Sequence, residues 1–437
     1  MSGSDTVFNV KPGGALHGAV RVAGDKSISH RSIMLGSLAE GVTEVNGFLE
    51  GDDCLATMNA FRAMGVSIDH HGEGWVRIEG AGLKGLQKPA GPLDLGNSGT
   101  SMRLLAGICA GQDFDVTLTG DASLSKRPMR RVTEPLEAMG ARIETAAGGT
   151  PPLKIAGGHL LKGMDYVLPM ASAQVKSCVL LAGMYAEGET CTTEPAPTRD
   201  HTERMLNGFG YSVQRQGARA CLQGGGKLTA ARIDVPADIS SAAFFMVGAS
   251  IAPNSDITLE NVGINPTRDG VITILREMGA NIEVLNPREV CGEPVADIRV
   301  RAARLQGIAI PEAQVPLAID EFPAIFVAAA CAEGTTVLTG AEELRVKESD
   351  RIQVMADGLQ ALGISAEPTP DGIRIQGGQP GAGTVQSHGD HRISMSFAMA
   401  ALRARGEIII EDCANVNTSF PGFVELAASC GLNISQN

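Results

Sequence analysis

Lysine and arginine residues stand beside glycine, serine and asparagine at several points where an apolar, helix-like stretch begins. The strings GDKSISHR at 24–31, LGNSGTSMR at 95–103 and SHGDHRIS at 387–394 show this pattern. The first N–H groups of a helix lack partners within the helix, and the helix dipole makes this end positive, so anions bind there. The pattern predicts sites for phosphate and carboxylate groups held without a metal. The cations expected in first helical turns are Lys26, Arg31, Arg103, Lys176 and Arg392.

Carboxylates that could carry acid–base chemistry occur in two further strings. IDEFP puts Asp320 and Glu321 at an expected helix start, where capping alone would explain one of them. VKESDR, at 346–351, alternates charges as surface i,i+3 and i,i+4 pairs do, and such pairing remains the alternative to a functional role. DASLSKRPMRR, at 121–131, holds four cations, and for this string a solvated face is the alternative.

A metal site is not predicted. HGDHR could present His388, Asp390 and His391 to an ion, but the chain offers no further group in ligand spacing. A helix-start anion site through His391 and Arg392 is favoured instead. No metal and no cofactor are therefore expected.

The nine cysteines are spread along the chain without any CxxC pair. Cys109, Cys178 and Cys331 stand inside apolar, helix-like runs. This distribution predicts reduced thiols in a protein core rather than a disulfide framework.

The helix starts recur about every 70 residues, which indicates one supersecondary unit copied six times. The other three openings are MASAQVKS at 170–177, PADISSA at 236–242 and AIDEFPA at 318–324. Each copy closes on a glycine followed by a short β-prone tail. The closing glycines are Gly65, Gly140, Gly210, Gly279, Gly363 and Gly431.

The first copy predicts the structure of the unit. Asp25 and Ser27 are candidate N-caps of a helix that Gly41 would end, and a strand follows over 42–48. A second, amphipathic helix over 52–65 precedes two more strands. The opening helices of the copies are apolar nearly all round and belong inside, so six helix–strand–helix–strands units should form two α/β globes of three. The chain is expected to cross between them near 235–245.

Bulk composition fits a small anionic ligand. The 437-residue chain has a net charge of −13 and a pI near 5.2, which argues against nucleic acid, while a basic focus inside an acidic shell attracts small polyanions. No apolar run is long enough to cross a bilayer, and the N-terminus lacks a signal or transit pattern. A cytoplasmic protein with no membrane partner is expected.

These strings, with GDASLSKRP, SAQVKS, TRDHTE, ELRVKESDR and TSFP, resemble 5-enolpyruvylshikimate-3-phosphate synthases in order and over essentially the whole chain, most closely the bacterial class II branch. The resemblance implies the family's inverse α/β barrel-like fold, with two domains of three βαβαββ units and buried parallel helices. One domain would span 21–236, and the other would combine 1–20 with 237–437. A monomer is expected.

The resemblance implies transfer of the enolpyruvyl group of phosphoenolpyruvate to the 5-hydroxyl of shikimate 3-phosphate, with release of phosphate, in aromatic amino-acid biosynthesis. Implied contacts of shikimate 3-phosphate are Lys26, Ser27, Arg31, Ser172, Gln174, Arg199, Asp320 and Lys347. Implied contacts of phosphoenolpyruvate are Lys26, Asn97, Gly99, Arg127, Gln174, Arg351 and Arg392.

The family pattern makes Glu348 the acid and base at carbon, Asp320 the group on the 5-hydroxyl, and Lys26 a catalytic bridge between the substrates. Gly99 stands where the family binds the herbicide glyphosate. Two positions depart from the pattern: Ala173 replaces a serine of some members, and Thr418 replaces a lysine of many.

Two alternatives remain open. The sister family transfers enolpyruvate to UDP-N-acetylglucosamine, but it has Lys-Asn where this chain has Lys26-Ser27, and usually a cysteine in the loop aligned with DASLSKRP. A non-enzymatic, acidic clamp built from α/β repeats would spread its cations along helix faces and be retained on DNA at low salt.

Overall fold

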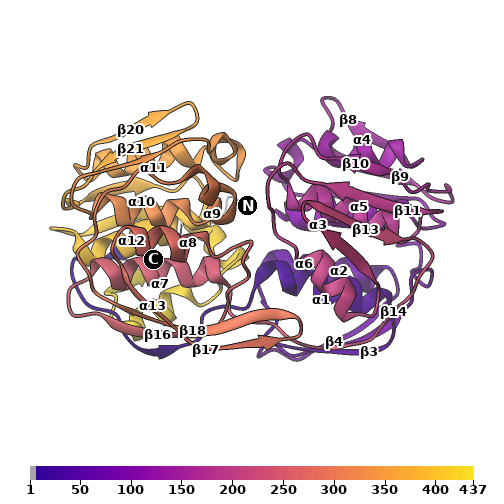
Figure 1. Cartoon of the computed structure of the whole chain (residues 1–437), viewed down its shortest axis with the longest axis horizontal. Coiled ribbons are helices and arrows are strands. Elements are labelled where there is room, and N and C mark those ends of the chain that lie inside the picture. Colours follow the sequence, from indigo (N-terminus) through magenta and orange to yellow (C-terminus); the bar gives the residue numbers. More distant parts are fainter. Residues whose placement is uncertain (1–5) are drawn as a thin grey trace. The chain divides into compact units, whose positions relative to one another are not determined.

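The computed structural model describes residues 6–437 as two compact α/β units, shown in Figure 1. Unit N comprises residues 24–235 and 290–293. Unit C comprises the described residues up to 23 together with 236–289 and 294–437. Residues 1–5, on which the prediction of no targeting segment partly rests, lie outside the described residues.

Unit N contains three copies of the repeat, each with its own sheet. The first copy has α1 (Lys26–Leu38), β3 (Ala39–Asn46), α2 (Asp52–Ala63), β4 (Ser67–His70) and β5 (Val76–Ala81). The second has β6 (Leu93–Asp94), α3 (Gly99–Ala110), β7 (Val116–Thr119), η1 (Leu124–Lys126), α4 (Arg130–Ala138), β8 (Arg142–Ala146) and β9 (Thr150–Ala156). The third has β10 (Asp165–Val167), α5 (Ala173–Gly183), β11 (Glu189–Thr193), α6 (His201–Gly208), β12 (Val213–Gln216) and β13 (Arg219–Gln223), and β14 (Leu228–Thr229) and β15 (Arg232–Asp234) return to pair with β3.

Unit C repeats the plan. Its first copy has α7 (Ile239–Ile251), β16 (Asp256–Gly263), α8 (Gly270–Glu277), β17 (Asn281–Val290) and β18 (Glu293–Arg301), joined by β2 (His17–Val20). The second has η2 (Glu312–Gln314), α9 (Val315–Ala318), α10 (Phe322–Ala330), β19 (Thr335–Leu338), η3 (Glu342–Val346), α11 (Arg351–Ala361), β20 (Ala366–Thr369) and β21 (Gly372–Gln376). The third has β22 (Gly383–Gln386), α12 (His391–Ala400), η4 (Ala401–Arg403), β23 (Ile408–Glu411), η5 (Ala414–Thr418), α13 (Phe423–Cys430) and β24 (Ile434–Gln436), joined by β1 (Phe8–Val10).

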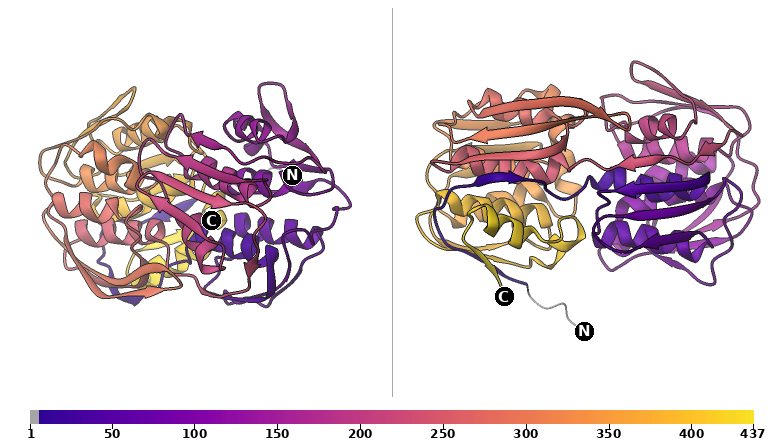
Figure 2. Two further views of the ribbon diagram at one scale, coloured as in Figure 1. Left: turned by 45° about the vertical axis from the view of Figure 1, so that its right-hand side comes forward. Right: turned by 90° about the horizontal axis from the view of Figure 1, so that it is seen from below.

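The sheets confirm the predicted βαβαββ repeat. In the sheet ordered β6-β7-β9-β8, β6 and β7 are parallel because α3 carries the chain back between them, and the remaining pairs are antiparallel. The sheet ordered β10-β11-β13-β12 has the same pattern. Figure 2 shows these sheets on the outside of helical cores.

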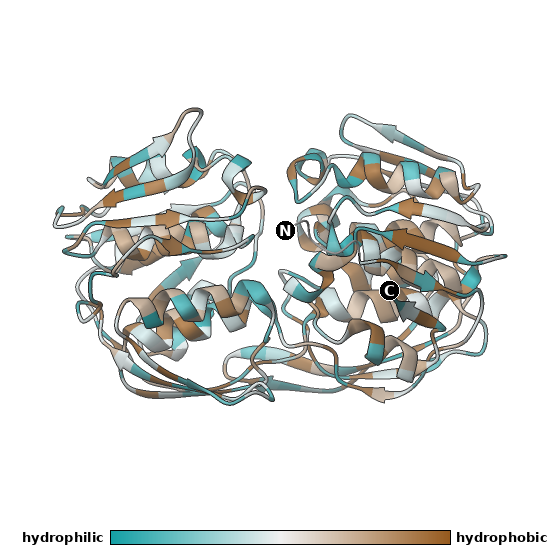
Figure 3. Ribbon diagram, turned by 180° about the vertical axis from the view of Figure 1, so that it is seen from behind, coloured by the Kyte–Doolittle hydropathy of each residue, from teal (hydrophilic) through white to brown (hydrophobic). Residues whose placement is uncertain are grey.

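The opening helices form the core of each unit, as their apolar sequences predict. Every residue of α7 and α10 is buried, and α7, α10 and α12 pack against one another in unit C. Figure 3 shows hydrophobic residues concentrated in the inner elements. Close packing in unit N requires Gly107 of α3, because a Cβ there would lie 2.3 Å from the carbonyl oxygen of Cys178 in α5.

The first copy departs from its prediction at the end of α1. The helix ends at Leu38 and the chain passes directly into β3, so Gly41 lies inside a strand, with φ of +105°, instead of ending a helix. Asp25 is the N-cap, accepting a hydrogen bond from the N–H of Ile28 at 2.8 Å, whereas Ser27 lies within the helix.

The tip of the hairpin formed by β17 and β18 belongs to the other unit, which no sequence pattern predicted. Residues 290–293 group with unit N, although the rest of the hairpin belongs to unit C. Glu293 at this tip is buried and lies 3.0 Å from Nδ1 of His201 in α6. The carbonyl of Gly292 at the tip also accepts a hydrogen bond, 2.9 Å long, from Arg204.

Within residues 6–437, no helix is long and apolar enough to cross a membrane.

His30 makes the stability of unit N sensitive to pH. This residue of α1 is fully buried, its Nδ1 lies 2.8 Å from Oγ1 of Thr57, and burial, with Lys26 and Arg31 nearby, holds its pKa well below the usual 6.5. The unfolded chain therefore binds this proton more readily, so stability is present above about pH 6.5 and falls as the pH drops below that value. Denaturant unfolding from pH 8 to pH 5 should show a steeper loss for the wild type than for His30→Gln. The exposed His17→Gln should behave as wild type, and equal slopes for all three proteins would contradict the assignment.

Candidate active site

Three helix starts in unit N carry predicted site residues. Ser98 caps α3 and Ser172 caps α5, each through its side-chain oxygen, as Asp25 caps α1. Because α1, α3 and α5 belong to one packed core, their first turns hold fixed positions relative to one another. Lys26, Gly99 and Gln174 lie in those turns.

The start of α1 presents two cations in different environments. Lys26 is partly exposed and forms an ion pair with Asp53 of α2. Arg31 is buried, and it donates hydrogen bonds to the Ser27 carbonyl at 3.0 Å, to Thr202 at 2.7 Å and to Ser177 at 2.9 Å. Burial, together with the positive charge of Arg199, lowers the pKa of Arg31 to about 10, although nearby carboxylates act to raise it. Arg31 thus stays charged at neutral pH, with its donors fixed by neutral oxygens.

The start of α3 brings together three of the predicted anion contacts. Arg127, which follows η1, donates to Oδ1 of Asn97 at 2.7 Å, and Asn97 in turn donates to Asp121. A Cβ on Gly99 would lie 3.2 Å from Nη1 of Arg127 and 3.0 Å from Nη1 of Arg103. Two guanidinium groups therefore flank the free backbone of a helix start, which is an arrangement suited to an anion.

Gln174 connects this cluster to α5. Its Oε1 accepts a hydrogen bond from Arg103 at 2.5 Å, and its Nε2 donates to Oγ1 of Thr100 at 3.0 Å. The structure thus gathers Asn97, Gly99, Arg127 and Gln174 within one part of unit N.

Lys176 was wrongly predicted to be an anion-binding cation. It is fully buried, 3.1 Å from Glu194 and 2.8 Å from Glu203, so its charge is neutralised inside the protein. Its Nζ also lies 3.5 Å from the carbonyl oxygen of Thr198. Lys176 instead secures the segment that leads to Arg199, which is partly buried.

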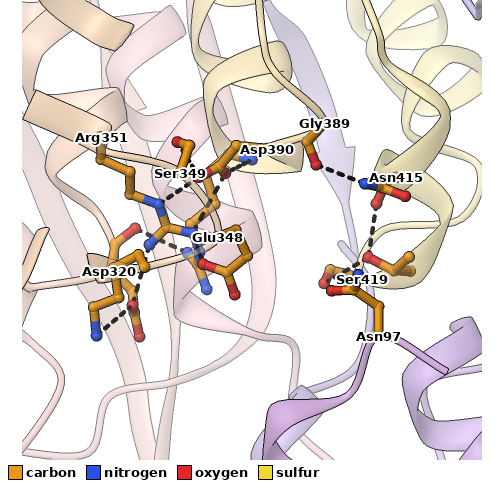
Figure 4. Close-up of polar contacts among 12 residues, drawn as sticks. Asn97, Asp320, Glu348, Ser349, Arg351, Gly389, Asp390, Asn415 and Ser419 are labelled. Atoms are coloured by element: carbon orange, nitrogen blue, oxygen red, sulfur yellow. Dashed lines mark hydrogen bonds and ion pairs between the residues drawn. The ribbon is translucent and has the colours of Figure 1, made fainter. Parts of the chain in front are cut away.

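Unit C presents a second group of predicted residues around Arg351. This arginine is completely buried and donates to Asp390 at 2.8 Å, to Glu348 at 2.6 Å and to Asp320 at 3.4 Å. Figure 4 shows the three carboxylates converging on the guanidinium group. Burial alone would lower the pKa of Arg351, but the three carboxylates outweigh it and raise the pKa. The alternative of surface pairing for VKESDR is therefore wrong for this residue.

Asp320 and Glu348 remain accessible beside this arginine. The side chain of Glu348 is 30% exposed, and Asp320 lies 3.7 Å from Nζ of Lys347. Arg392 donates to the Asp320 carbonyl at 3.0 Å. Glu321 occupies the N-cap position of α10, but its side chain makes no capping hydrogen bond, so capping does not explain IDEFP. Glu321 is buried instead, accepting a hydrogen bond from Ser240 and lying 3.8 Å from Arg392.

Sequence reasoning missed Asp390 as the main partner of Arg351. The HGDHR string offered Asp390 as a possible metal ligand, yet Asp390 is fully buried, caps α12 through the N–H of Arg392 and accepts a hydrogen bond from Arg351. An aspartate immediately before a helix start was the available signal. Asp53, the partner of Lys26, had no comparable signal.

The expectation of reduced thiols is wrong for one cysteine pair. Cys191 and Cys221 form a disulfide between neighbouring strands of unit N, whereas Cys109 and Cys178 are free and buried. Among residues 6–437, the group with metal-ligand spacing is Glu189, Cys191 and Cys221, and not the HGDHR string.

The model of the family EPSP synthase (3-phosphoshikimate 1-carboxyvinyltransferase) matches residues 10–426. The chain belongs to the EPSP synthase family. A 3-phosphoshikimate 1-carboxyvinyltransferase of Methylococcus capsulatus is 72% identical over 434 residues, covering 99% of each chain, and one of Alkalilimnicola ehrlichii is 70% identical over 431 residues, covering 98% of this chain and 96% of the relative.

A solved structure of EPSP synthase from Acinetobacter baumannii aligns with a TM-score of 0.90 and 60% identity, covering 99% of this chain and all of that chain. This agreement confirms the predicted family and the two-domain enolpyruvyl transferase fold. The clamp-like alternative is thereby excluded.

Replacement of Asp390 by asparagine should destabilise unit C strongly. The change leaves Arg351 buried with one carboxylate fewer, and breaking a buried ion pair by removing one partner costs about 3–5 kcal/mol. Denaturant unfolding followed by circular dichroism would measure this loss, because the Trp and Tyr residues that fluoresce lie in unit N. The exposed Glu367→Gln in the same unit serves as the matched control, with a change within about 0.5 kcal/mol. A comparable loss in both variants would show that the Arg351–Asp390 pair is not special.

Proposed function

We propose that this chain transfers the enolpyruvyl group of phosphoenolpyruvate to the 5-hydroxyl of shikimate 3-phosphate and releases phosphate. Membership of the EPSP synthase family over nearly the full length carries the proposal. The helix-start cations support it, since both substrates are anions that such groups bind. We further propose that the chain works as a monomer with two domains, one of 21–236 and one of 1–20 plus 237–437.

We propose that shikimate 3-phosphate binds through the residues that the family pattern assigns to it. Arg31 supports this role because its bonds to Ser27, Thr202 and Ser177 fix a buried, charged group at the start of α1. The remaining proposed contacts are Lys26, Ser27, Ser172, Gln174, Arg199, Asp320 and Lys347.

For phosphoenolpyruvate, the proposed contacts are Lys26, Asn97, Gly99, Arg127, Gln174, Arg351 and Arg392. Arg127 and Gly99 support this assignment by placing a guanidinium group against free helix-start N–H groups. Arg351 needs a different account because carboxylates surround it. A substrate carboxylate would replace Glu348 as a partner of Arg351, which would release Glu348 for chemistry.

The proposed chemistry is addition followed by elimination. The 5-hydroxyl oxygen attacks C2 of phosphoenolpyruvate while a proton is added to the C3 methylene, and the product is a tetrahedral ketal phosphate. Loss of a proton from the new methyl group then expels phosphate. Glu348 is the proposed acid and base at C3, Asp320 the group that receives the hydroxyl proton, and Lys26 the cation that contacts both substrates. The 30% exposure of Glu348 supports its role, because a proton donor must reach the substrate.

An assay of phosphate release tests the function. Purified protein should release phosphate from phosphoenolpyruvate only when shikimate 3-phosphate is present. UDP-N-acetylglucosamine in its place should give no release. Phosphate release that depends on UDP-N-acetylglucosamine would assign the chain the sister family's activity. Phosphate release without either acceptor would contradict both assignments.

Glu348→Gln should lower kcat by about 100-fold to 10,000-fold, because the amide cannot exchange a proton with C3. The KM values of both substrates should change by no more than a few-fold, since the side chain keeps its size. The nearby, exposed Glu342→Gln provides the matched control and should retain wild-type turnover. Wild-type turnover in Glu348→Gln would remove this residue from the mechanism.

Gly99→Ala should weaken binding of phosphoenolpyruvate and of its competitor glyphosate. The new methyl group would lie 3.0 Å and 3.2 Å from the guanidinium nitrogens of Arg103 and Arg127, which must then shift away from the helix start. Steady-state inhibition should show a higher inhibition constant for glyphosate and a higher KM for phosphoenolpyruvate. Gly91→Ala, where a Cβ meets no atom within 4 Å, is the control. An unchanged glyphosate inhibition constant in Gly99→Ala would contradict the steric account.

A further inference from the structure

The disulfide between Cys191 and Cys221 lies on the outer face of the third sheet of unit N. The two residues are directly opposite each other on antiparallel strands β11 and β13, with their Cα atoms 4.1 Å apart. Their neighbours along the strands point to the core, since Thr190, Thr192 and Leu222 are buried and Thr190 packs against Gly183 of α5. Because side chains alternate along a strand, both sulfur atoms lie on the other face of the sheet from Thr190, Thr192 and Leu222. On that face Cys191 is buried, 2% exposed, whereas Cys221 is only partly buried.

Charged side chains cover the two sulfur atoms unequally. Nε of Arg219 lies 3.3 Å from Sγ of Cys221, and Arg219 is itself held by Asp165 at 2.7 Å. Oε2 of Glu189 lies 3.5 Å from Sγ of Cys191. In the reduced protein the cation would stabilise a thiolate on Cys221, while the carboxylate would disfavour one on Cys191.

This environment differs from that of the core cysteines. Cys109 and Cys178 are buried inside helices of unit N, and burial raises the pKa of each thiol to about 12. Core thiols of this kind are inert at neutral pH. By contrast, Cys221 is only partly buried, and the side chain of Arg219 beside it is 44% exposed.

We propose that Cys191 and Cys221 are a reversible dithiol–disulfide site that exchanges with small disulfides, with Cys221 as the reacting thiol. The Cys221 thiolate attacks one sulfur of oxidised glutathione, forms a mixed disulfide and expels one glutathione thiolate. Cys191 then loses its proton, attacks the Cys221 sulfur and expels the second glutathione. Two protein thiols and one glutathione disulfide thus become one protein disulfide and two glutathione thiols.

The disulfide links β11 to β13, and the residue that follows β11, Glu194, belongs to a buried ion-pair cluster. Glu194 follows β11 directly and pairs with Lys176 at 3.1 Å, and it also accepts a hydrogen bond from Thr198 at 2.5 Å. The disulfide closes a loop with a sequence separation of 30 residues, so the oxidised protein has fewer unfolded conformations than the reduced one. We expect oxidation to raise the thermal midpoint of unfolding by about 5 °C. This site is independent of the proposed catalytic function.

A redox titration of the full-length, folded protein tests the proposal. The protein is equilibrated in buffers with varied ratios of reduced to oxidised glutathione, free thiols are alkylated, and peptides are quantified by mass spectrometry. Cys191 and Cys221 should become protected together with a single two-electron midpoint, and excess reduced glutathione should expose both again. Cys291→Ser, which removes an exposed and separate thiol, should leave this titration unchanged.

A second variant separates reactivity from folding. Arg219→Gln should slow alkylation of Cys221 in the reduced protein by about 3-fold or more at pH 7, because the thiolate loses its cation. Arg142→Gln, a change at an exposed strand arginine elsewhere in unit N, is the matched control and should leave that rate unchanged.

Three results would overturn the proposal. The first is free alkylation of both thiols even in fully oxidised glutathione, and the second is a bond that reduced glutathione opens only after the protein unfolds. The third concerns metal binding, because ligand atoms of Glu189, Cys191 and Cys221 lie within 4.8 Å of one another. If the reduced protein binds one zinc ion that blocks alkylation of both cysteines, the group is a metal site instead.

Discussion

The apolar character of the opening helices constrains everything else in this structure. Helices such as α7 and α10 are buried along their whole length, so they have no solvent-exposed face that could carry polar functional groups. Only their ends reach the boundary of the core, and there the unpaired N–H groups must be satisfied. Caps such as Asp25, Ser98, Ser172 and Asp390 satisfy some of them. Lys26, Gly99, Gln174 and Arg392 lie in the first turns of opening helices, whereas Arg127 follows η1 and Arg351 begins α11.

Buried charges in the two units are neutralised in different ways. Lys176 meets Glu194 and Glu203 in a closed cluster, where each group is almost fully buried. Arg351 meets Asp390 in an equally buried pair, but its other partners, Asp320 and Glu348, are partly exposed. Taking two charges out of water is costly, so each cluster depends on complete pairing. The first cluster supports the backbone near Arg199, whereas the second leaves two carboxylates within reach of a ligand.

The sequence predicted the repeat, the order of its elements and most helix starts, because these depend on local spacing and capping. It failed where the outcome depends on residues distant in the chain. Lys176 looked like Lys26 in sequence, and only the positions of Glu194 and Glu203 separate a structural cation from an accessible one. Arg351 looked like a surface residue because its partners Asp320 and Asp390 lie 31 and 39 positions away. Cys191 and Cys221 meet only because β11 pairs with β13 in one register.

The hairpin tip at 290–293 determines how this protein can be divided. A fragment cut at residues 24 and 235 would contain α6 but not Glu293, so His201 would lose its carboxylate partner. Arg204 would likewise lose the carbonyl of Gly292. Unit N is therefore completed by four residues of the same chain that are translated well after residue 235. During synthesis on the ribosome, its final packing has to wait until the chain has grown past residue 293.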